Sequence, residues 1–127
     1  MPLPSILIID DNREIARIFA SILQRESYRT DVVFDGETAV SHLSESVPDL
    51  IILDMNLPNQ ITGEDILTKV RQDVRFADTR IVVVTGFPQA ARFLPVKPDT
   101  VLCKPVHLEQ IRHIVARYCP VSPAALV

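Results

Sequence analysis

The sequence predicts an α/β fold in which a doubly wound, five-stranded parallel sheet lies between helices. Short apolar runs alternate five times with stretches of helical periodicity along the 127 residues, which indicates repeated βα units. The apolar runs are unbroken rather than alternating, as is typical of strands covered on both faces. Five such units favour the strand order 2-1-3-4-5, in which ligands bind at the carboxyl ends of the strands.

The first half of the chain supplies three expected strands and two expected helices. Strands are predicted over 5–9, 30–34 and 50–53. Between the first two, a helix carries an apolar stripe at i, i+3, i+4, i+7 and i+8, formed by Ile15, Ile18, Phe19, Ile22 and Leu23. The second helix is marked by Ala39, Val40 and Leu43, and Pro48 stops it.

The second half follows the same alternation with one weak element. A loop rich in turn-forming residues spans 54–63, and Ile66, Leu67, Val70 and Val74 indicate a third helix. Strands are predicted over 80–84 and 100–103, and a closing helix over about 108–118. Prolines at 88, 95 and 98 leave room for only a short or irregular fourth helix near 89–93. We expect a single domain over 1–127, with a core at about 5–118 and a loose tail over 119–127.

The composition excludes several classes of protein. Apolar residues make up 47% of the chain and charged residues 23%, as in soluble globular proteins. A net charge of −3 without a basic run argues against nucleic acid or a membrane as a partner. No apolar stretch approaches the roughly 20 residues that cross a bilayer, and no export signal is visible. Cys103 and Cys119 lack metal-ligand spacing, and Cys103 is expected in the core. A cytoplasmic protein with reduced thiols is the simplest interpretation.

Polar residues follow four of the predicted strands at their carboxyl ends. Asp10 and Asp11 follow the first strand, Asp54 the third, Thr85 the fourth and Lys104 the fifth. In the order 2-1-3-4-5 these strands are neighbours, about 4.8 Å apart. Three carboxylates, a hydroxyl and an ammonium group should therefore meet at one edge of the sheet. Packing of the core does not require charged residues at these places.

This set of groups suggests a particular chemistry. Three neighbouring carboxylates repel one another unless a cation neutralises them, and Mg²⁺ suits a site of few carboxylates that also holds water and phosphoryl oxygens. Asp54 lies between the acidic pair and the Thr85/Lys104 pair, where it can attack phosphorus and form an aspartyl phosphate. The metal and Lys104 would stabilise the charge in transfer, and Thr85 can donate to a phosphoryl oxygen.

Four motifs together resemble the receiver domain of two-component response regulators, over residues 5 to about 118. They are Ile8-Ile9-Asp10-Asp11-Asn12, the run from Ile52 to Pro58, Val83-Val84-Thr85-Gly86 and Cys103-Lys104-Pro105. The resemblance implies a flavodoxin-like fold with Asp54 as the phosphoacceptor in a Mg²⁺-dependent reaction. It further implies Asp10, Asp11 and the backbone carbonyl of Asn56 as metal ligands, Thr85 as the switch hydroxyl and Lys104 as the phosphoryl-binding lysine.

The resemblance also implies what the domain works with. The phosphoryl donor would be a sensor histidine kinase or a histidine phosphotransfer protein, and a downstream protein or fused output domain would receive the signal. The domain would catalyse only its own phosphorylation and dephosphorylation, and so would not be an enzyme acting on other substrates. A homodimer is compatible with this pattern.

The sequence departs from the family pattern at three places. Gly63 falls one position later after Asp54 than the pattern has it, and Val101 stands where an aromatic switch residue is expected. The segment between Thr85 and Lys104 is short and broken by prolines. We therefore hypothesise that the signal leaves this domain by something other than the usual rearrangement of a threonine and an aromatic residue.

Simpler and competing interpretations remain open from the sequence. Asp11 or Asn12 can serve as the N-cap of the first helix. A receiver-like scaffold that acts without phosphorylation would not need the full set of site residues. A phosphohydrolase with an aspartate nucleophile usually has a second acid two positions on, where Asn56 stands. A flavin-binding protein of this architecture would bind phosphate after the first strand, where Asp10 and Asp11 would repel it.

Overall fold

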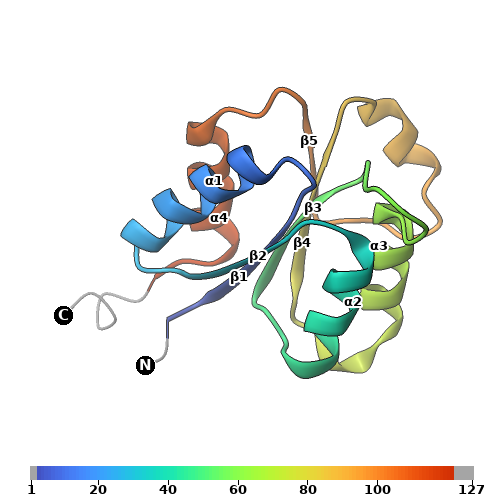
Figure 1. Ribbon diagram of the computed structural model, residues 1–127, viewed down its shortest axis with the longest axis horizontal. Coiled ribbons are helices and arrows are strands. Elements are labelled where there is room, and N and C mark those ends of the chain that lie inside the picture. The colour runs from blue at the N-terminus through green and yellow to red at the C-terminus, as the bar shows by residue number, and fades with distance from the viewer. Residues whose placement is uncertain (1–2, 122–127) are drawn as a thin grey trace.

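A computed structural model, which describes residues 3–121, contains one parallel sheet with helices on both faces (Figure 1). The strands are β1 (Ser5–Ile9), β2 (Arg29–Val33), β3 (Leu50–Asp54), β4 (Arg80–Thr85) and β5 (Thr100–Cys103). The helices are α1 (Arg13–Arg25), α2 (Gly36–Glu45), α3 (Gly63–Gln72) and α4 (Leu108–Tyr118), with short 3₁₀ helices η1 (Val74–Phe76) and η2 (Pro88–Phe93). The strand order is β2-β1-β3-β4-β5 and every pair is parallel. The predicted fold class and strand order are confirmed.

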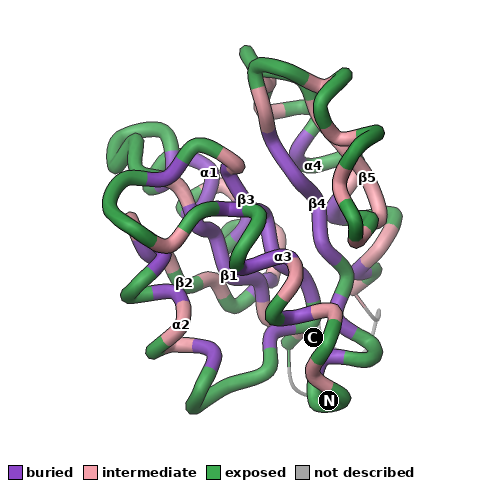
Figure 2. Tube along the Cα trace, turned by 90° about the vertical axis from the view of Figure 1, so that its right-hand side faces the viewer, coloured by how far each residue is buried: buried purple, intermediate pink, exposed green. Residues whose placement is uncertain are grey.

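The sheet separates two apolar layers. Helices α1 and α4 cover one face, and α2 and α3 cover the other (Figure 1). Successive side chains of a strand point to opposite faces, so Ile6 and Ile8 of β1 join the first layer and Leu7 and Ile9 the second. The strands at the centre of the sheet are buried along most of their length (Figure 2). Polar groups can therefore collect only where the strands end.

Helix α1 buries a stripe that agrees with the predicted one only at Phe19 and Leu23. Its buried side chains are Ala16, Phe19, Ala20 and Leu23. Ile15 and Ile18 are 42% and 49% exposed, so their assignment to the core was wrong. The two alanines have no bulky side chain to hold the helix away, so α1 can pack closely on the sheet.

Helix α3 ends before Val74, which was predicted to lie in its apolar stripe. Asp73 has extended backbone angles and its side chain accepts a hydrogen bond from the Arg75 amide, which starts η1 instead. As a result Val74 is 89% exposed, and Phe76, absent from the predicted core, is buried. Strand β2 also begins one residue earlier than predicted, because the Arg29 amide donates to the Pro4 carbonyl, and it ends one residue earlier, at Val33.

The segment between β4 and β5 contains only η2, in agreement with the predicted short or irregular fourth helix. Cys103 is exposed rather than part of the core, since it is the last residue of an edge strand. Of the expected loose tail, Cys119 is buried and its carbonyl accepts a hydrogen bond from the Tyr28 hydroxyl, while residues 122–127 lie outside the described residues. Within residues 3–121, no helix combines the length and the apolar character needed to cross a membrane.

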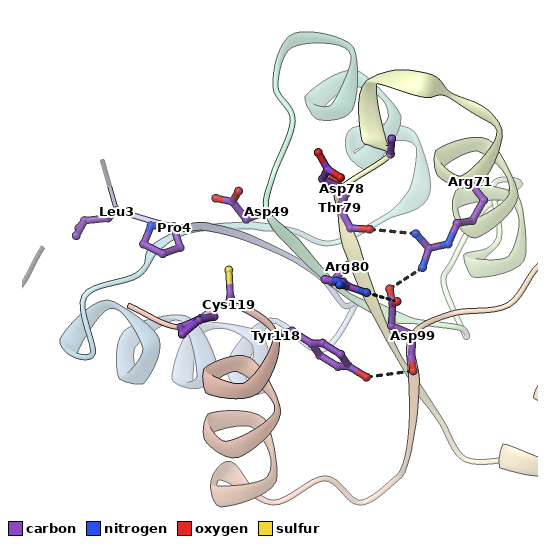
Figure 3. Close-up of a pocket in the computed structure, with 12 residues that line it drawn as sticks. Leu3, Pro4, Asp49, Arg71, Asp78, Thr79, Arg80, Asp99, Tyr118 and Cys119 are labelled. Carbon is purple, nitrogen blue, oxygen red and sulfur yellow. Dashed lines mark hydrogen bonds and ion pairs between the residues drawn. The ribbon is translucent and has the colours of Figure 1, made fainter. Parts of the chain in front are cut away.

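An ionic network closes the edge of the sheet where the strands begin (Figure 3). Asp99, just before β5, accepts hydrogen bonds from Arg71 of α3 at 2.6 Å and from Arg80 of β4 at 3.2 Å. The Ile81 amide donates to the same carboxylate at 2.8 Å, and the Tyr118 hydroxyl donates to the Asp99 carbonyl. Partial burial favours a higher pKa for Asp99, but these donors outweigh it and hold the pKa below its ordinary value. The network ties α3, β4, β5 and α4 together.

Candidate functional site

Three carboxylates meet at the carboxyl edge of the sheet. Asp54 is the last residue of β3, while Asp10 and Asp11 follow β1, which pairs with β3 in register Ile9 to Leu53. Each of the three acids offers an oxygen atom, and these atoms all lie within 4.8 Å of one another. The structure thus brings together the acids that the sequence singled out.

Asp54 is the buried member of this cluster, with 1% of its surface exposed. Its Oδ1 accepts the Asn56 amide at 2.9 Å, and its Oδ2 accepts the Lys104 ammonium group at 2.9 Å. Burial of a carboxylate is costly unless it is paired and hydrogen-bonded, and both oxygens of Asp54 are. The side chain is therefore held in a fixed orientation at the end of its strand.

Lys104 reaches Asp54 from the end of β5. Its amide donates to the Thr85 carbonyl at 2.8 Å, which extends the β4–β5 ladder to the edge of the site. The peptide bond between Lys104 and Pro105 is cis. The lysine side chain is 39% exposed, while its ammonium group contacts the buried Asp54 carboxylate.

The electrostatics of the cluster favour a divalent cation. Burial, together with the charge on Asp54, raises the pKa of Asp10 to about 6, although the Asn12 amide opposes this rise through its bond to Asp10 Oδ1. The ionised cluster is therefore unfavourable by itself. Three carboxylates against the single ammonium group of Lys104 leave an excess of two negative charges, and all three offer the hard oxygen ligands that Mg²⁺ prefers.

Asp11 and Asn12, the two residues after Asp10, have different roles. The Asn12 side chain accepts the Ile15 amide at 3.2 Å and is the N-cap of α1. Asp11 is exposed and is not needed as a cap. The capping role that the sequence left open between them thus belongs to Asn12, and Asp11 is free to face the cluster.

The loop after Asp54 is held in place by Gly63. A Cβ atom at this position would come within 2.6 Å of the Met55 Cα and 2.8 Å of the Asp54 carbonyl oxygen. Only glycine permits this close approach of α3 to the end of β3. Within the loop, Asn59 has a φ of 70°, a left-handed conformation that asparagine tolerates well. The role of the Asn56 carbonyl as a metal ligand stays a prediction, because the structure fixes only its amide.

Thr85 ends β4 beside the cluster but is not bonded to it. Its Oγ1 accepts the Phe87 amide at 3.0 Å, and no hydrogen bond joins it to Asp54 in the described residues. An apolar hollow lined by Thr85, Val83 and Phe87 lies next to it, which sequence reasoning missed. Its lining comes from α3, β4 and η2, so no local sequence pattern marks it.

Comparison with known proteins agrees with this geometry. Residues 6–116 match the response regulator receiver domain family. The transcriptional regulatory protein BaeR of Escherichia coli is 33% identical over 117 residues, covering 90% of this chain and 46% of that protein. Sporulation initiation phosphotransferase F of Bacillus subtilis is 28% identical, covering 92% of this chain and 94% of that protein.

A solved structure shows the same arrangement of the chain. The response regulator TrrA of Thermotoga maritima, determined in complex with Mg²⁺ and BeF, superposes with a TM-score of 0.79 at 25% identity, covering 91% of this chain and 99% of that chain. Several of the curated regulators are longer, and the chain spans about half of their length or less. With its sheet order, its acidic cluster and its match over residues 6–116, the chain belongs to the response regulator receiver domain family, the phosphoacceptor signalling switches of two-component systems.

Proposed function

We propose that this domain takes a phosphoryl group from a phosphohistidine donor onto Asp54 and changes conformation to control a partner. The observation that carries the proposal is the contact of Asp54 with Lys104 at 2.9 Å inside the three-carboxylate cluster. A scaffold that works without phosphorylation has no need of a buried, paired aspartate at this edge. The intact cluster therefore disfavours that alternative.

The residues present supply the parts of a phosphoryl transfer. A carboxylate oxygen of Asp54 forms the new O–P bond while the P–N bond of the phosphohistidine breaks, and the electron pair returns to the imidazole nitrogen, which then takes a proton from solvent. Lys104 already bonds to Asp54 Oδ2 and is placed to bond a phosphoryl oxygen as charge develops. Thr85 can turn its hydroxyl from the Phe87 amide toward the phosphoryl group.

We propose Mg²⁺ as the cation of the site, held by Asp10, Asp11, Asp54 and the Asn56 carbonyl. When bound, Mg²⁺ would neutralise the carboxylates and stabilise the charge of the phosphoryl oxygens. The support is the pKa of Asp10, raised by burial and by Asp54, and the excess of two negative charges over the Lys104 ammonium group.

The remaining assignments follow from the same reaction. The donor would be a sensor histidine kinase or a histidine phosphotransfer protein, and the domain would turn over only its own phosphoryl group. We propose a single domain over the chain and a cytoplasmic location, with which the two free cysteines, Cys103 and Cys119, are compatible.

Mass spectrometry after incubation with acetyl phosphate tests the proposal. The wild-type protein should gain about 80 Da, the mass of one phosphoryl group, in the presence of Mg²⁺ and not in EDTA. Asp54→Asn keeps the shape of the side chain and should gain nothing. Asp78→Asn changes an exposed aspartate at the opposite edge and should behave as wild type.

Rapid hydrolysis of the adduct must be separated from a failure to form it. Binding of beryllofluoride, followed by ¹⁹F NMR, reports the phosphorylated conformation without hydrolysis. A wild-type protein that shows neither an adduct nor bound beryllofluoride would favour the phosphorylation-independent scaffold.

A further inference from the structure

We infer that Phe87 is the aromatic part of this domain's switch, and that its ring enters the apolar hollow beside Thr85 when Asp54 carries a phosphoryl group. The inference rests on the proposed function. It assigns to a residue of the β4–η2 loop the place that the family pattern gives to an aromatic residue at position 101, where this chain has valine.

The hollow has the size and the lining to receive one phenyl ring. It has a volume of about 240 Å³, and a cavity of roughly 150 Å³ lined by apolar side chains is known to bind benzene. It lies between the start of α3, the end of β4 and η2. Except for Glu64 and Thr85, its lining is apolar: Met55, Val83, Phe87, Ala90, Ala91, Phe93 and Leu94.

Phe87 lies at the rim of this hollow rather than inside it. It is 76% exposed, although it contributes to the lining. An exposed phenyl ring beside an apolar hollow of adequate size gains free energy when it moves in, since apolar surface leaves water. A second arrangement of this loop is therefore available at low cost.

The Thr85 hydroxyl links this movement to the phosphorylation site. In the present arrangement Thr85 Oγ1 accepts the Phe87 amide at 3.0 Å, which fixes the loop with the ring outside. When the Thr85 hydroxyl turns toward a phosphoryl group on Asp54, the hydrogen bond from the Phe87 amide either breaks or moves together with the hydroxyl. In either case the backbone at Phe87 is released from its position, and Thr85 leaves the wall of the hollow.

Gly86 gives the loop the freedom for such a change. A Cβ atom here would meet no heavy atom within 4 Å, and the residue does not have a positive φ, so this conformation does not require glycine. Glycine nevertheless has more backbone conformations than any other residue. Gly86→Ala should accordingly leave the unphosphorylated fold intact and hinder only the movement.

Two other residues near the site, Val101 and Phe93, lack a comparable link to Thr85. Val101 is aliphatic, and it already packs partly buried against the layer on the α2/α3 face. Phe93 also lines the hollow and is 86% exposed, but it lies at the far end of η2, with no hydrogen bond to Thr85 among the described residues. Phe93 is therefore the matched control for Phe87.

The absence of tryptophan from the chain allows a direct test by fluorescence. Phe87→Trp and Phe93→Trp each introduce a single reporter. On addition of Mg²⁺ and beryllofluoride, we expect the emission of Phe87→Trp to shift to shorter wavelength and its quenching by acrylamide to fall about twofold or more. Phe93→Trp, at the wall of the same hollow, should show a clearly smaller change in emission and quenching.

A second measurement avoids the larger indole ring. The chain has five phenylalanines, so labelling with 4-fluorophenylalanine gives five ¹⁹F signals, and the signal missing in Phe87→Leu identifies Phe87. Beryllofluoride should move this signal and reduce its response to a soluble paramagnetic agent, and Gly86→Ala should weaken both effects. Beryllofluoride binding without a change at Phe87 in either experiment overturns the inference alone. Failure to bind beryllofluoride overturns the proposed function, and the inference with it.

Discussion

At the scale of single residues, the site is governed by unequal burial of like charges. Asp54 is almost wholly buried, Asp10 is partly buried and Asp11 is exposed, yet their oxygens lie within 4.8 Å of one another. Lys104 compensates only one of the three charges, and it contacts the most buried one. The protein thus pairs the acid that cannot reach solvent with a lysine, and the two negative charges in excess require a cation from solution.

Removal of the Lys104 charge should weaken the binding of a phosphoryl analogue. A hydrogen bond to a charged group contributes about 1.5–3 kcal/mol, so we expect Lys104→Gln to lower beryllofluoride affinity roughly 10- to 100-fold. Titration in the presence of Mg²⁺, followed by ¹⁹F NMR, measures this. Lys69→Gln, an exposed lysine of α3, should leave the affinity unchanged. An equal beryllofluoride affinity in Lys104→Gln and wild type would show that Lys104 does not contact the bound phosphoryl analogue.

Mg²⁺ should stabilise the folded protein, and Asp10 should be required for this. A ligand that binds only the native state at 100 times its Kd adds about 2.7 kcal/mol to the free energy of unfolding. We expect a higher Tm for the wild type in Mg²⁺ than in EDTA. Asp10→Asn should show little response, because it removes one of the three carboxylates. It should also be at least as stable as wild type in EDTA, since burial and Asp54 disfavour the Asp10 charge. An undiminished Mg²⁺ response in Asp10→Asn would contradict the assignment.

At the scale of the elements, residues that follow strands were easier to predict than residues within helices. A strand that is buried on both faces ends where the first charged residue stands, so Asp10 and Asp54 mark the carboxyl ends of β1 and β3. A helical stripe is less certain, because several faces of α1 contain apolar residues. The large isoleucines Ile15 and Ile18 suggested one face, whereas tertiary packing selected the neighbouring one, which carries the small residues Ala16 and Ala20.

The two faces of α1 should differ in their contribution to stability. Leu23 is fully buried and Ile18 is 49% exposed, so truncation of each to alanine removes similar atoms from different environments. We expect Leu23→Ala to cost about 2–5 kcal/mol and Ile18→Ala about 0.5 kcal/mol or less. Urea unfolding measured side by side gives both values. Comparable losses in the two variants would mean that α1 packs through the predicted stripe after all.

At the scale of the whole molecule, the two edges of the sheet have different roles. The carboxyl edge holds the acidic cluster, and the opposite edge holds the Asp99 network, which Figure 3 shows. The first could be predicted from the sequence, because the strand order alone brings Asp10, Asp54 and Lys104 together. The second could not, because Asp99 lies in a proline-rich stretch without periodicity and its partner Arg71 lies 28 positions away. The hollow beside Thr85 escaped prediction for the same reason, since three elements have to be placed before it exists.

Loss of the Asp99 network should therefore lower stability without affecting the phosphorylation site. Asn in place of Asp99 removes the charge that Arg71 and Arg80 contact, and we expect Asp99→Asn to cost about 1–3 kcal/mol at pH 7. The pKa of Asp99 is below its ordinary value in the folded protein, so its contribution is present above about pH 4 and is lost as the pH falls through the lowered pKa. The difference in stability between wild type and Asp99→Asn should accordingly narrow below pH 4, as measured by urea unfolding between pH 7 and pH 3.

The beryllofluoride affinity of Asp99→Asn at pH 7 should stay within about twofold of wild type, because the two edges share no charged contact in residues 3–121 and distant sites act nearly independently. A difference that is as large at pH 3 as at pH 7 would show that Asp99 stabilises the fold by its shape and not by its charge, whereas a loss of affinity would show that the two edges are coupled.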